Sequence, residues 1–415
     1  MSTRPQVISC AFALAEAFFG VCDIDHAQLL LTGRIDAWPE YWDLGEEDRA
    51  RVCALLRHRG DDLASLEVFA KAVSELGGTT KLNGYRVDGD HVLPIHGVDP
   101  RLHADRLLKE LNKQHKPHTL PVAEPGRYYT TLRTTPDRTE SLIDLTGMTA
   151  PHRDPVTLRT ALAVSQVELS ADELGKMAAR IDEARGDTHR QARLKALFEH
   201  LPRSLTIRAG GVIQSLIAPT GYGKSVLMEV TGTLAVEKGV PTALVVPTRV
   251  AALSLAKRIE ENLALLGING ICTPLVSPKD AMADAERLAA IGDAFGDWAY
   301  ERLAYGCALP AATESDVAVD TWVPGHEPCR DLRLRHRHGR RHACPWRDGC
   351  GKFRLMREAV RADVIVTAHA TFFNGRMHIP IRTEAGVSDR MAVEELVMRR
   401  CQLIIIDEVD QFQRA

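Results

Sequence analysis

The sequence lacks a strong net charge, since its 415 residues include 52 lysines and arginines against 55 aspartates and glutamates. A protein that binds nucleic acid over most of its surface carries a clear excess of basic residues. Any nucleic-acid site in this chain must therefore be a local patch. The length allows two or three domains, and the 45% of hydrophobic residues can bury a substantial core.

The sequence also lacks an apolar run long enough to cross a bilayer. Residues 1–28 contain an apolar stretch, but Glu16 interrupts it, and it has neither a basic start nor a clear cleavage site. This pattern predicts an amphipathic helix and not a signal peptide. We therefore expect a cytoplasmic protein without a membrane partner, in a compartment where disulfides are rare.

Cysteine pairs with the C-x-x-C spacing of zinc ribbons are missing as well. Four of the nine cysteines nevertheless lie close together in the sequence, and these are Cys307, Cys329, Cys344 and Cys350. In a reducing compartment such clustering indicates metal. Iron–sulfur clusters take four thiolates with looser spacing. A loop that binds no metal is an alternative, and a mixed zinc site also stays open because of His326, His336, His338 and His342.

Residues 1–185 are predicted to form a mainly helical accessory domain in which no motif points to a particular chemistry. The apolar periodicity predicts helices at 6–19, 46–58, 62–77, 101–113, 156–184 and, just beyond, 187–201. Two turn pairs beside β-formers, Asn83-Gly84 and Asp88-Gly89, predict a short hairpin. Residues 115–156 are rich in Pro, Thr, Arg and Gly, which predicts irregular structure with at most one hairpin.

Beyond residue 205 the sequence alternates between predicted strands and helices. Short apolar runs predict strands at 212–217, 243–246, 363–366 and 403–406. Helical runs separate them, and this alternation is typical of a parallel α/β sheet. We therefore expect an α/β domain over residues 186–415, interrupted by an insertion at 275–350 that contains the four clustered cysteines.

One segment has the sequence of a phosphate-binding loop, except that alanine replaces the first glycine: Ala218, Pro219, Thr220, Gly221, Tyr222, Gly223, Lys224 and Ser225. The glycines let backbone N–H groups curl around phosphate oxygens. Lys224 supplies a charge for the β- and γ-phosphates, and Ser225 offers a hydroxyl to Mg²⁺. A chance glycine-rich turn would lack the apolar run before it and the helical run after it. We therefore predict that the whole segment lines an ATP site.

Two acids, Asp407 and Glu408, come directly after the apolar run 403–406. Acids at the carboxyl end of a buried strand hold Mg²⁺ beside a phosphate-binding loop. An apolar run followed by two acids is common by itself, but together with the loop it predicts a Walker B strand. Asp407 is then expected in the Mg²⁺ shell, and Glu408 is expected to be the general base for the attacking water.

These motifs resemble those of DinG/XPD-type DNA helicases of superfamily 2. The phosphate loop is similar to motif I, where alanine commonly takes the first position. Residues 407–410, DEVD, are similar to motif II, which is usually DEAH in this subfamily. Residues 362–369 are similar to the A-D-V-I-V-x-N-H segment after the cluster domain, with Ala368 in place of asparagine. Residues 247–249, Pro-Thr-Arg, resemble motif Ia, and Gln191 lies at about the distance of a glutamine that reads adenine.

The resemblance covers residues 187–415 and implies a RecA-like first motor domain of an ATP-dependent helicase that moves 5′→3′ on single-stranded DNA. It implies ATP and Mg²⁺ as cofactors, Lys224 and Glu408 as catalytic residues, and a [4Fe–4S] cluster on the four cysteines, with zinc as the alternative. Seven arginines against two aspartates between Cys329 and Cys350 predict phosphate contacts, unless this run is only a solvated surface. The candidate DNA contacts are Arg249, Arg335, Arg337, Arg340 and Arg341.

Motif III and a second RecA-like domain, which such motors also need, are not found in these 415 residues. ATP normally lies between the two domains, and an arginine finger from the second is worth about 10³–10⁵ in rate. We therefore expect this chain alone to hydrolyse ATP poorly and to need a second helicase half, in another chain or in a longer product. The alternatives are a non-catalytic phosphate-loop scaffold that binds nucleic acid or a partner helicase, and a nucleotide hydrolase outside the helicases.

Overall fold

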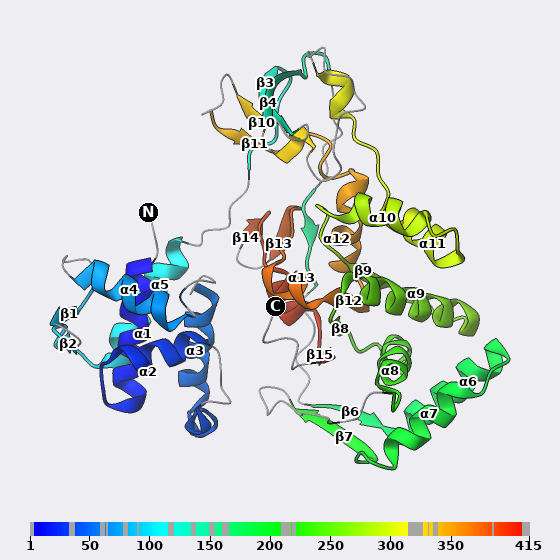
Figure 1. The fold of residues 1–415 in the computed structure, drawn as a ribbon, viewed down its shortest axis with the longest axis horizontal. Helices are drawn as coiled ribbons and strands as arrows, with labels where there is room; N and C mark the ends of the chain where they lie inside the picture. The colour runs from blue at the N-terminus through cyan, green and yellow to red at the C-terminus, as the bar shows by residue number, and fades with distance from the viewer. Residues whose placement is uncertain are drawn as a thin grey trace. The chain divides into compact units, whose positions relative to one another are not determined.

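The computed structural model describes residues 4–32, 38–58, 63, 65–77, 82–88, 91–114, 120–133, 138–148, 154–159, 166–208, 217, 221–313, 327–330, 332–334, 339–383 and 386–408. The chain divides into two compact units, Met1–Lys116 and Pro117–Ala415 (Figure 1). This division lies near residue 116 and not near residue 185, because residues 120–208 contribute strands and helices to the second unit.

The first unit is mainly helical. Its described elements are α1 (Arg4–Phe19), α2 (Ile24–Thr32), the 3₁₀ helix η2 (Pro39–Asp43), α3 (Glu46–His58), α4 (Leu66–Gly77), the hairpin of β1 (Tyr85–Asp88) and β2 (His91–Pro94), and α5 (Pro100–Gln114). The hairpin and the helices predicted at 6–19, 46–58 and 101–113 are confirmed, and the helix predicted from residue 62 begins at Leu66. Helix α2 was not predicted, because its nine residues are too short for a clear apolar period.

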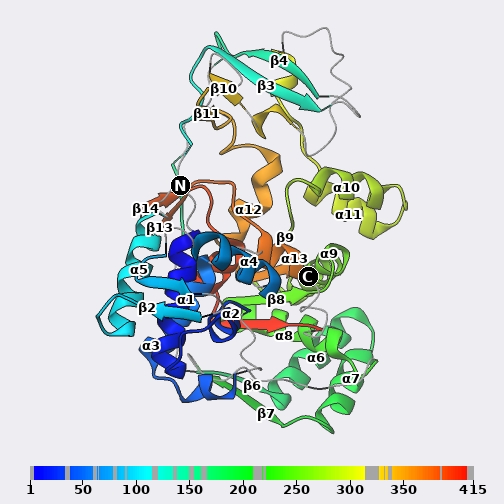
Figure 2. The ribbon, with the colours of Figure 1, turned by 60° about the vertical axis from the view of Figure 1, so that its left-hand side comes forward.

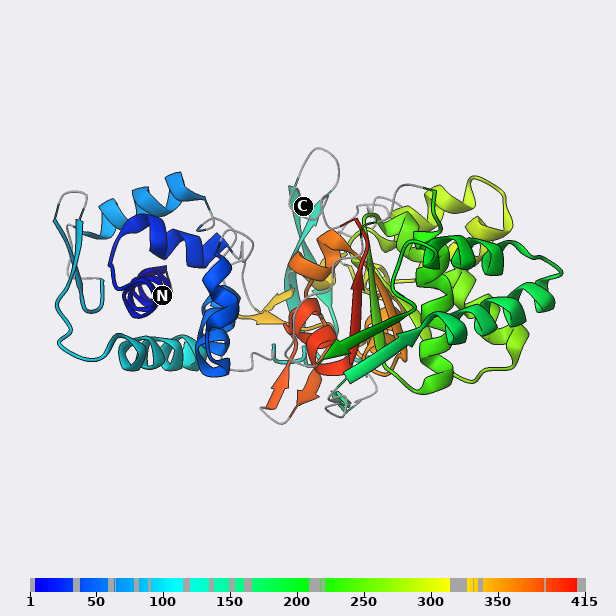
Figure 3. The ribbon, with the colours of Figure 1, turned by 90° about the horizontal axis from the view of Figure 1, so that it is seen from below.

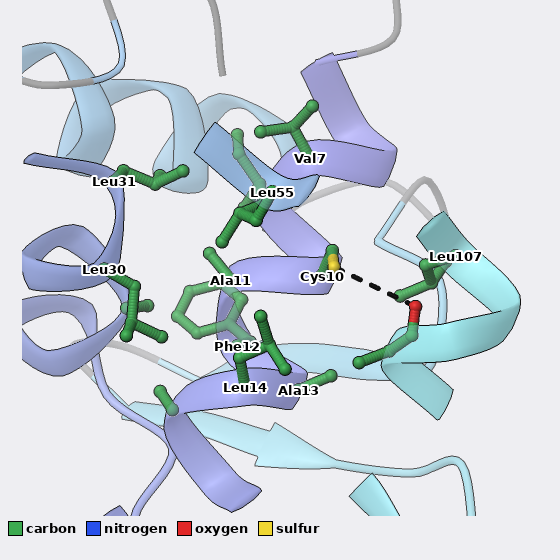
Figure 4. Packing of buried hydrophobic residues seen from close by; sticks show 14 of the residues in the cluster. Val7, Cys10, Ala11, Phe12, Ala13, Leu14, Leu30, Leu31, Leu55 and Leu107 are labelled. Atoms are coloured by element: carbon green, nitrogen blue, oxygen red, sulfur yellow. Dashed lines mark hydrogen bonds between the residues drawn. The ribbon is translucent and has the colours of Figure 1, made fainter. Parts of the chain in front are cut away.

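Helix α1 forms the centre of the first unit's core. All residues over Val7–Ala15 are buried, so the helix is enclosed on most sides. The prediction that this helix is amphipathic is therefore wrong. The ring of Phe12 packs against Phe69 of α4 and Tyr85 of β1, with ring centroids 5.9 and 5.6 Å apart. Figure 4 shows apolar side chains from α2, α3 and α5 meeting α1 around this ring.

Among the described residues, no single helix is both long enough and apolar enough to cross a membrane. Helices α1 and α2 meet the test of length and composition only as a pair, with a bend of 103° between them.

A parallel sheet forms the centre of the second unit. Among the described residues it has the order β15-β8-β12-β9, with β8 at Thr242–Val246, β9 at Cys272–Leu275, β12 at Val364–Ala368 and β15 at Leu403–Ile406. The strands predicted at 243–246, 363–366 and 403–406 are confirmed. The strand predicted at 212–217 lies outside the described residues apart from Ile217. The chain is thus a mixed α/β protein with a helical first unit.

Helices cover both faces of this sheet (Figure 3). Leu244 and Val366 pack in one core with α8 (Lys224–Lys238) and α9 (Arg249–Leu266), whereas Val245 and Ile365 pack in another with α12 (Arg354–Ala359), α13 (His369–Asn374) and α14 (Val393–Arg400). Strands buried on both faces are apolar throughout, which is why these strands could be recognised from the sequence. Two further helices, α10 (Ala281–Ala289) and α11 (Ala294–Leu303), pack beside α9.

The segment before this sheet differs from its prediction. The helix predicted at 156–184 is wrong in its first half, where β5 (Val156–Thr157) and β6 (Gln166–Ser170) lie, and α6 spans Ala171–Arg185. Strand β6 pairs with β7 (Ser204–Arg208), and β5 pairs with β13 (Ile381–Thr383), which also pairs with β14 (Gly386–Ser388). Partner strands distant in sequence thus override the local helical pattern. Helix α7 (His189–Phe198) confirms the prediction at 187–201.

A second sheet, in the order β11-β10-β3-β4, joins two distant segments (Figure 2). Strands β3 (Arg127–Arg133) and β4 (Arg138–Asp144) precede the parallel sheet, whereas β10 (Leu332–Leu334) and β11 (Arg341–His342) belong to the insertion. The 3₁₀ helices η4 (Leu309–Ala312) and η6 (Pro328–Arg330) pack with them. We call the described residues within 120–148 and 304–350 the cysteine module. Residues 120–148 therefore belong to the fold of the insertion and not to an N-terminal accessory domain.

A buried ion-pair network joins the helices around α8. Arg190 of α7 donates through Nε to Glu229 of α8 at 2.8 Å and through Nη1 to Asp182 of α6 at 3.3 Å. Asn262 of α9 also donates to the Glu229 carboxylate, at 3.0 Å. These four residues are between 0 and 6% exposed. Charges buried to this degree persist only when they are paired, so the network sets how the four helices pack.

Replacing Arg190 with alanine should destabilise the second unit by about 3–5 kcal/mol, because Asp182 would lose its buried ion pair and Glu229 would keep only its longer one to Arg258, at 3.6 Å. The matched control is Arg180→Ala, which removes an exposed ion pair between α6 and Glu237 of α8 and should cost about 0–1 kcal/mol. Urea unfolding measures both values. Equal losses in the two variants would show that the buried network has no special part in stability.

Candidate nucleotide site and cysteine cluster

The predicted nucleotide residues lie at the carboxyl edge of the parallel sheet. Helix α8 ends at Lys238 and β8 starts at Thr242, so α8 runs back along the sheet and begins at the edge where β8 ends. Residues 221–225 therefore lie at the same edge as Asp407 and Glu408, because β15 is parallel to β8. Ligands of parallel α/β sheets bind outside this edge.

The described part of the predicted phosphate loop has the backbone that its glycines allow. Gly221 and Gly223 have φ of +88° and +98°, in the left-handed region that other residues avoid. Gly223 is the N-cap of α8, whose first residues are Lys224 and Ser225. Ser225 is exposed and Lys224 is half-buried, so both polar groups are accessible at a helix N-terminus, where anions are stabilised. Residues 218–220 lie outside the described residues.

Asp407 and Glu408 follow β15 as predicted. The Asp407 N–H donates to Val245 O at 2.8 Å, and the Asp407 carbonyl accepts from Nε2 of His369 at 2.9 Å. His369 is 2% exposed and follows β12, so the end of β15 is tied to the ends of two other strands. Glu408 has φ of +50°, which costs a non-glycine residue about 1–2 kcal/mol. Backbone strain of this kind gathers at functional sites.

Arg249 is engaged within the protein. It follows Thr248, whose Oγ1 accepts from the Ala251 N–H at 3.1 Å and so caps α9. The Arg249 guanidinium donates to Asp284 of α10 at 2.7 Å and to Asp280 at 3.1 Å. A DNA phosphate would have to displace two carboxylates that hold α10 against α9. Arg249 is therefore better explained as a structural residue than as the predicted DNA contact.

Helix α7 lies beside the predicted phosphate loop. Gln191, the candidate adenine reader, is exposed, and its backbone N–H donates to Asp182 at 2.9 Å. The side chain that reaches the loop is Arg193, whose Nη1 donates to Gly221 O at 2.5 Å. The sequence analysis missed Arg193, because no motif contains it and only the packing of α7 brings it to the loop.

The four clustered cysteines converge in the cysteine module. Cys307 follows α11, Cys329 lies in η6, Cys344 follows β11, and Cys350 precedes the 3₁₀ helix η7 (Gly351–Phe353). Burial raises the pKa of the Cys307 thiol to about 11, and the neighbouring Cys350 adds to the shift. Burial also raises the pKa of Cys344 to about 12, with contributions from Cys307 and Cys350. The pKa of Cys329 is raised by burial and then by Cys344 and Cys307. These mutual effects require the thiols to be neighbours.

Cationic side chains lie beside these thiols. Lys352 lowers the pKa of Cys329 against the effect of burial, and Arg347 does so for Cys344. Lys352 is held in place by a short ion pair with the buried carboxylate of Glu327. Positive charge favours thiolates, which are the form that binds metal. The carboxylate of Glu327 acts in the opposite direction on the pKa of Cys307 and Cys329, and burial remains the larger effect on all three thiols.

A zinc ion and a [4Fe–4S] cluster hold four cysteine sulfurs at different distances from one another. A single zinc ion binds each thiolate at about 2.3 Å and so brings the sulfurs within about 4 Å of one another. Among the described residues, which include all four cysteines, no three of these sulfurs lie within 4.8 Å of one another. A [4Fe–4S] cluster binds each thiolate through a different iron atom and so accepts wider spacing.

Asp182, Asp187 and His189 form a group whose ligand atoms lie within 4.8 Å of one another. Nη1 of Arg190 is 3.3 Å from Asp182 and 3.4 Å from Asp187, and His189 is hydrogen-bonded to Asp187. The guanidinium supplies the positive charge that a metal would bring. Asp182 therefore belongs to the buried ion-pair network, and the exposed Asp187 and His189 lie beside it, so Arg190 explains this group better than a metal does.

The arginines of the insertion lie partly on one face of the second sheet. Arg341 of β11 is opposite Arg333 of β10, which is opposite Tyr129 of β3, and directly opposite residues share a face. We call these three residues the outer arginine face; the other face is buried in the module's core. Arg340, next to Arg341, is exposed. Two predicted DNA contacts, Arg335 and Arg337, lie outside the described residues, as do His326, His336 and His338.

No protein-family model, curated protein or solved structure matches this chain. The likeness to DinG/XPD-type helicases therefore rests on the sequence motifs alone.

Replacing Glu408 with glycine should stabilise the second unit by about 0.5–1 kcal/mol, because glycine adopts φ of +50° without strain. Glu408→Gln is the matched control, since it removes the charge but keeps the strain and should leave stability unchanged. Urea unfolding of the two variants measures the difference. If the Glu408→Gly protein is no more stable than the Glu408→Gln protein, the backbone of Glu408 is not strained.

Proposed function

We propose that residues 186–415 bind ATP and Mg²⁺ as the first RecA-like motor domain of a DinG/XPD-like helicase that acts on single-stranded DNA. The observation that carries the proposal is the meeting of two motifs at one sheet edge, residues 221–225 at the start of α8 and residues 407–408 at the end of β15. The chain order supports it as well, because the cysteine insertion lies between β9 and β12, before the acidic motif.

Each polar group in this arrangement has a role in moving the γ-phosphoryl group to water. Lys224 and the N-terminus of α8 would bind the β- and γ-phosphates. Ser225 and Asp407 would hold Mg²⁺, which when bound neutralises phosphate charge. Glu408 would accept the proton of the attacking water, whose oxygen bonds to the γ-phosphorus as the bond to the bridging oxygen breaks, leaving ADP and phosphate. In the family a second RecA-like domain supplies the arginine finger.

The cysteine module is proposed to bind a [4Fe–4S] cluster through Cys307, Cys329, Cys344 and Cys350. The support is the convergence of four half-buried thiols beside Lys352 and Arg347. The cluster, when bound, would supply a rigid cross-link between segments that otherwise share only a small core. Cys350 leads through η7 into α12, which packs against the parallel sheet. Helix α12 therefore connects the cysteine module to the sheet that carries the proposed ATP site.

The outer arginine face is proposed to contact single-stranded DNA, together with Arg340. Arginines neutralise phosphates, and Tyr129, which lies on β3 opposite Arg333, offers a ring on which a base can stack. Trp346 packs against the module's core, so Tyr129 is the better candidate for stacking.

Replacing Lys224 with alanine should weaken MgATP binding by at least about tenfold, because the phosphates would lose a charged hydrogen bond. Lys238→Ala, at the other end of the same helix, is the matched control and should bind as the wild type does. Isothermal calorimetry measures both dissociation constants. Equal binding by the two variants would contradict the proposed phosphate site.

Measurements of ATP turnover and DNA binding distinguish a helicase motor from a non-catalytic scaffold. Stimulation of ATP turnover by single-stranded DNA would contradict the scaffold and also the expectation that this chain alone hydrolyses ATP poorly, whereas nucleotide binding without any DNA binding at low salt would support a nucleotide hydrolase outside the helicases. If Tyr129→Ala and Arg341→Ala bind DNA as tightly as the wild type at low salt, the outer arginine face is not the DNA surface.

Protein purified without oxygen should be brown and contain about four iron and four sulfide ions per chain. Cys344→Ser should lose most of both, whereas Cys22→Ser in the first unit should keep them. Retained MgADP binding by Cys344→Ser would show that the parallel sheet is still folded. A colourless wild-type protein with one zinc ion per chain would disprove the iron–sulfur assignment.

A further inference from the structure

Three contacts connect one segment, residues 193–200, to the predicted phosphate loop. Arg193 donates through Nη1 to Gly221 O at 2.5 Å. The α7 backbone approaches Gly223 so closely that a Cβ there would lie 3.4 Å from Arg193 O. The His200 ring meets the Tyr222 ring edge-on, with centroids 5.5 Å apart. Three successive loop residues are thus held from one side.

The contact at Gly221 has a consequence for the next residue. The Gly221 carbonyl and the Tyr222 N–H belong to one trans peptide plane, in which C=O and N–H point in opposite directions. A donor that holds the carbonyl on the α7 side therefore turns the Tyr222 N–H toward the opposite side. That side is where a phosphate-binding loop presents its amides to the ligand.

The position of Arg193 is set by the buried network. Arg190 and Arg193 are three residues apart on α7 and so lie on neighbouring parts of one helix face. Arg190 is tied to Glu229 of α8, and the loop leads directly into α8. The donor and the loop that it holds are therefore connected to the same helix, which keeps their spacing constant.

We propose that Arg193 is a positioning residue for phosphate binding: by holding the Gly221 carbonyl outward, it orients the Tyr222 N–H toward the bound pyrophosphate group of a nucleoside di- or triphosphate. This inference rests on the proposed nucleotide site. It assigns Arg193 to the phosphates and not to the base, because its partner is loop backbone.

The test compares Arg193→Ala, Arg193→Lys and Lys195→Ala, the last being an exposed cation two residues along the same helix. Calorimetry gives their dissociation constants for MgADP and for MgGDP. Arg193→Ala should bind both nucleotides about tenfold more weakly, because an oriented amide is lost whichever base is present. Arg193→Lys should stay within about threefold of the wild type, since one donor is sufficient for one hydrogen bond. Lys195→Ala should bind as the wild type does.

Thermal unfolding without nucleotide separates positioning from a structural role. Arg193 is exposed, so all three variants should unfold at the wild-type temperature. A tenfold loss of affinity at unchanged melting temperature, restored by lysine, supports the proposal. Unchanged affinity in Arg193→Ala, or a loss confined to MgADP, overturns it while leaving the nucleotide site intact. A wild-type protein that binds neither nucleotide overturns the proposed site, and this inference with it.

Discussion

The buried pairing of Arg190 with Glu229 and Asp182 is the constraint on which the candidate site depends. It joins α7, α8 and α6 through charges that are almost fully removed from water. Such charges tolerate only geometries that keep them paired, so the helices pack in a narrow range of arrangements. The start of α8 is the predicted phosphate loop, and α7 carries Arg193 to that loop. The same buried network thus connects the helix that begins at the predicted phosphate loop and the helix that carries Arg193.

The parallel sheet then collects chemistry from distant parts of the chain. Strands β8, β12 and β15 end at one edge, where His369 bridges to the carbonyl of Asp407. The cysteine module is assembled differently, because β3 precedes the parallel sheet in the chain and pairs with β10 of the insertion. The second unit therefore contains both the candidate nucleotide site at the sheet edge and the four clustered cysteines, and α12 connects the two.

Much of the parallel sheet was predictable, because strands buried on both faces are continuous apolar runs, as at 243–246 and 403–406. Asp407 and Glu408 were predictable for the same reason, since they adjoin such a run, whereas Lys224 and Ser225 follow the run 212–217, of which only Ile217 is among the described residues. The prediction failed at residues 156–170, where β6 takes its partner from β7. It also placed the domain boundary at residue 185, because nothing local indicates that 120–148 pair with the insertion.

The sequence by itself determined which residues have the chemistry to bind phosphate, magnesium and metal, because residue types and short spacings are local properties. It also determined where the buried strands lie, since burial requires apolar side chains. Only the tertiary structure decided that Arg249 pairs with Asp280 and Asp284, and that Arg193 is the arginine that reaches the loop. The packing of helices determines which groups lie within hydrogen-bonding reach of a long side chain. That choice depends on contacts between residues far apart in the chain, which no local pattern records.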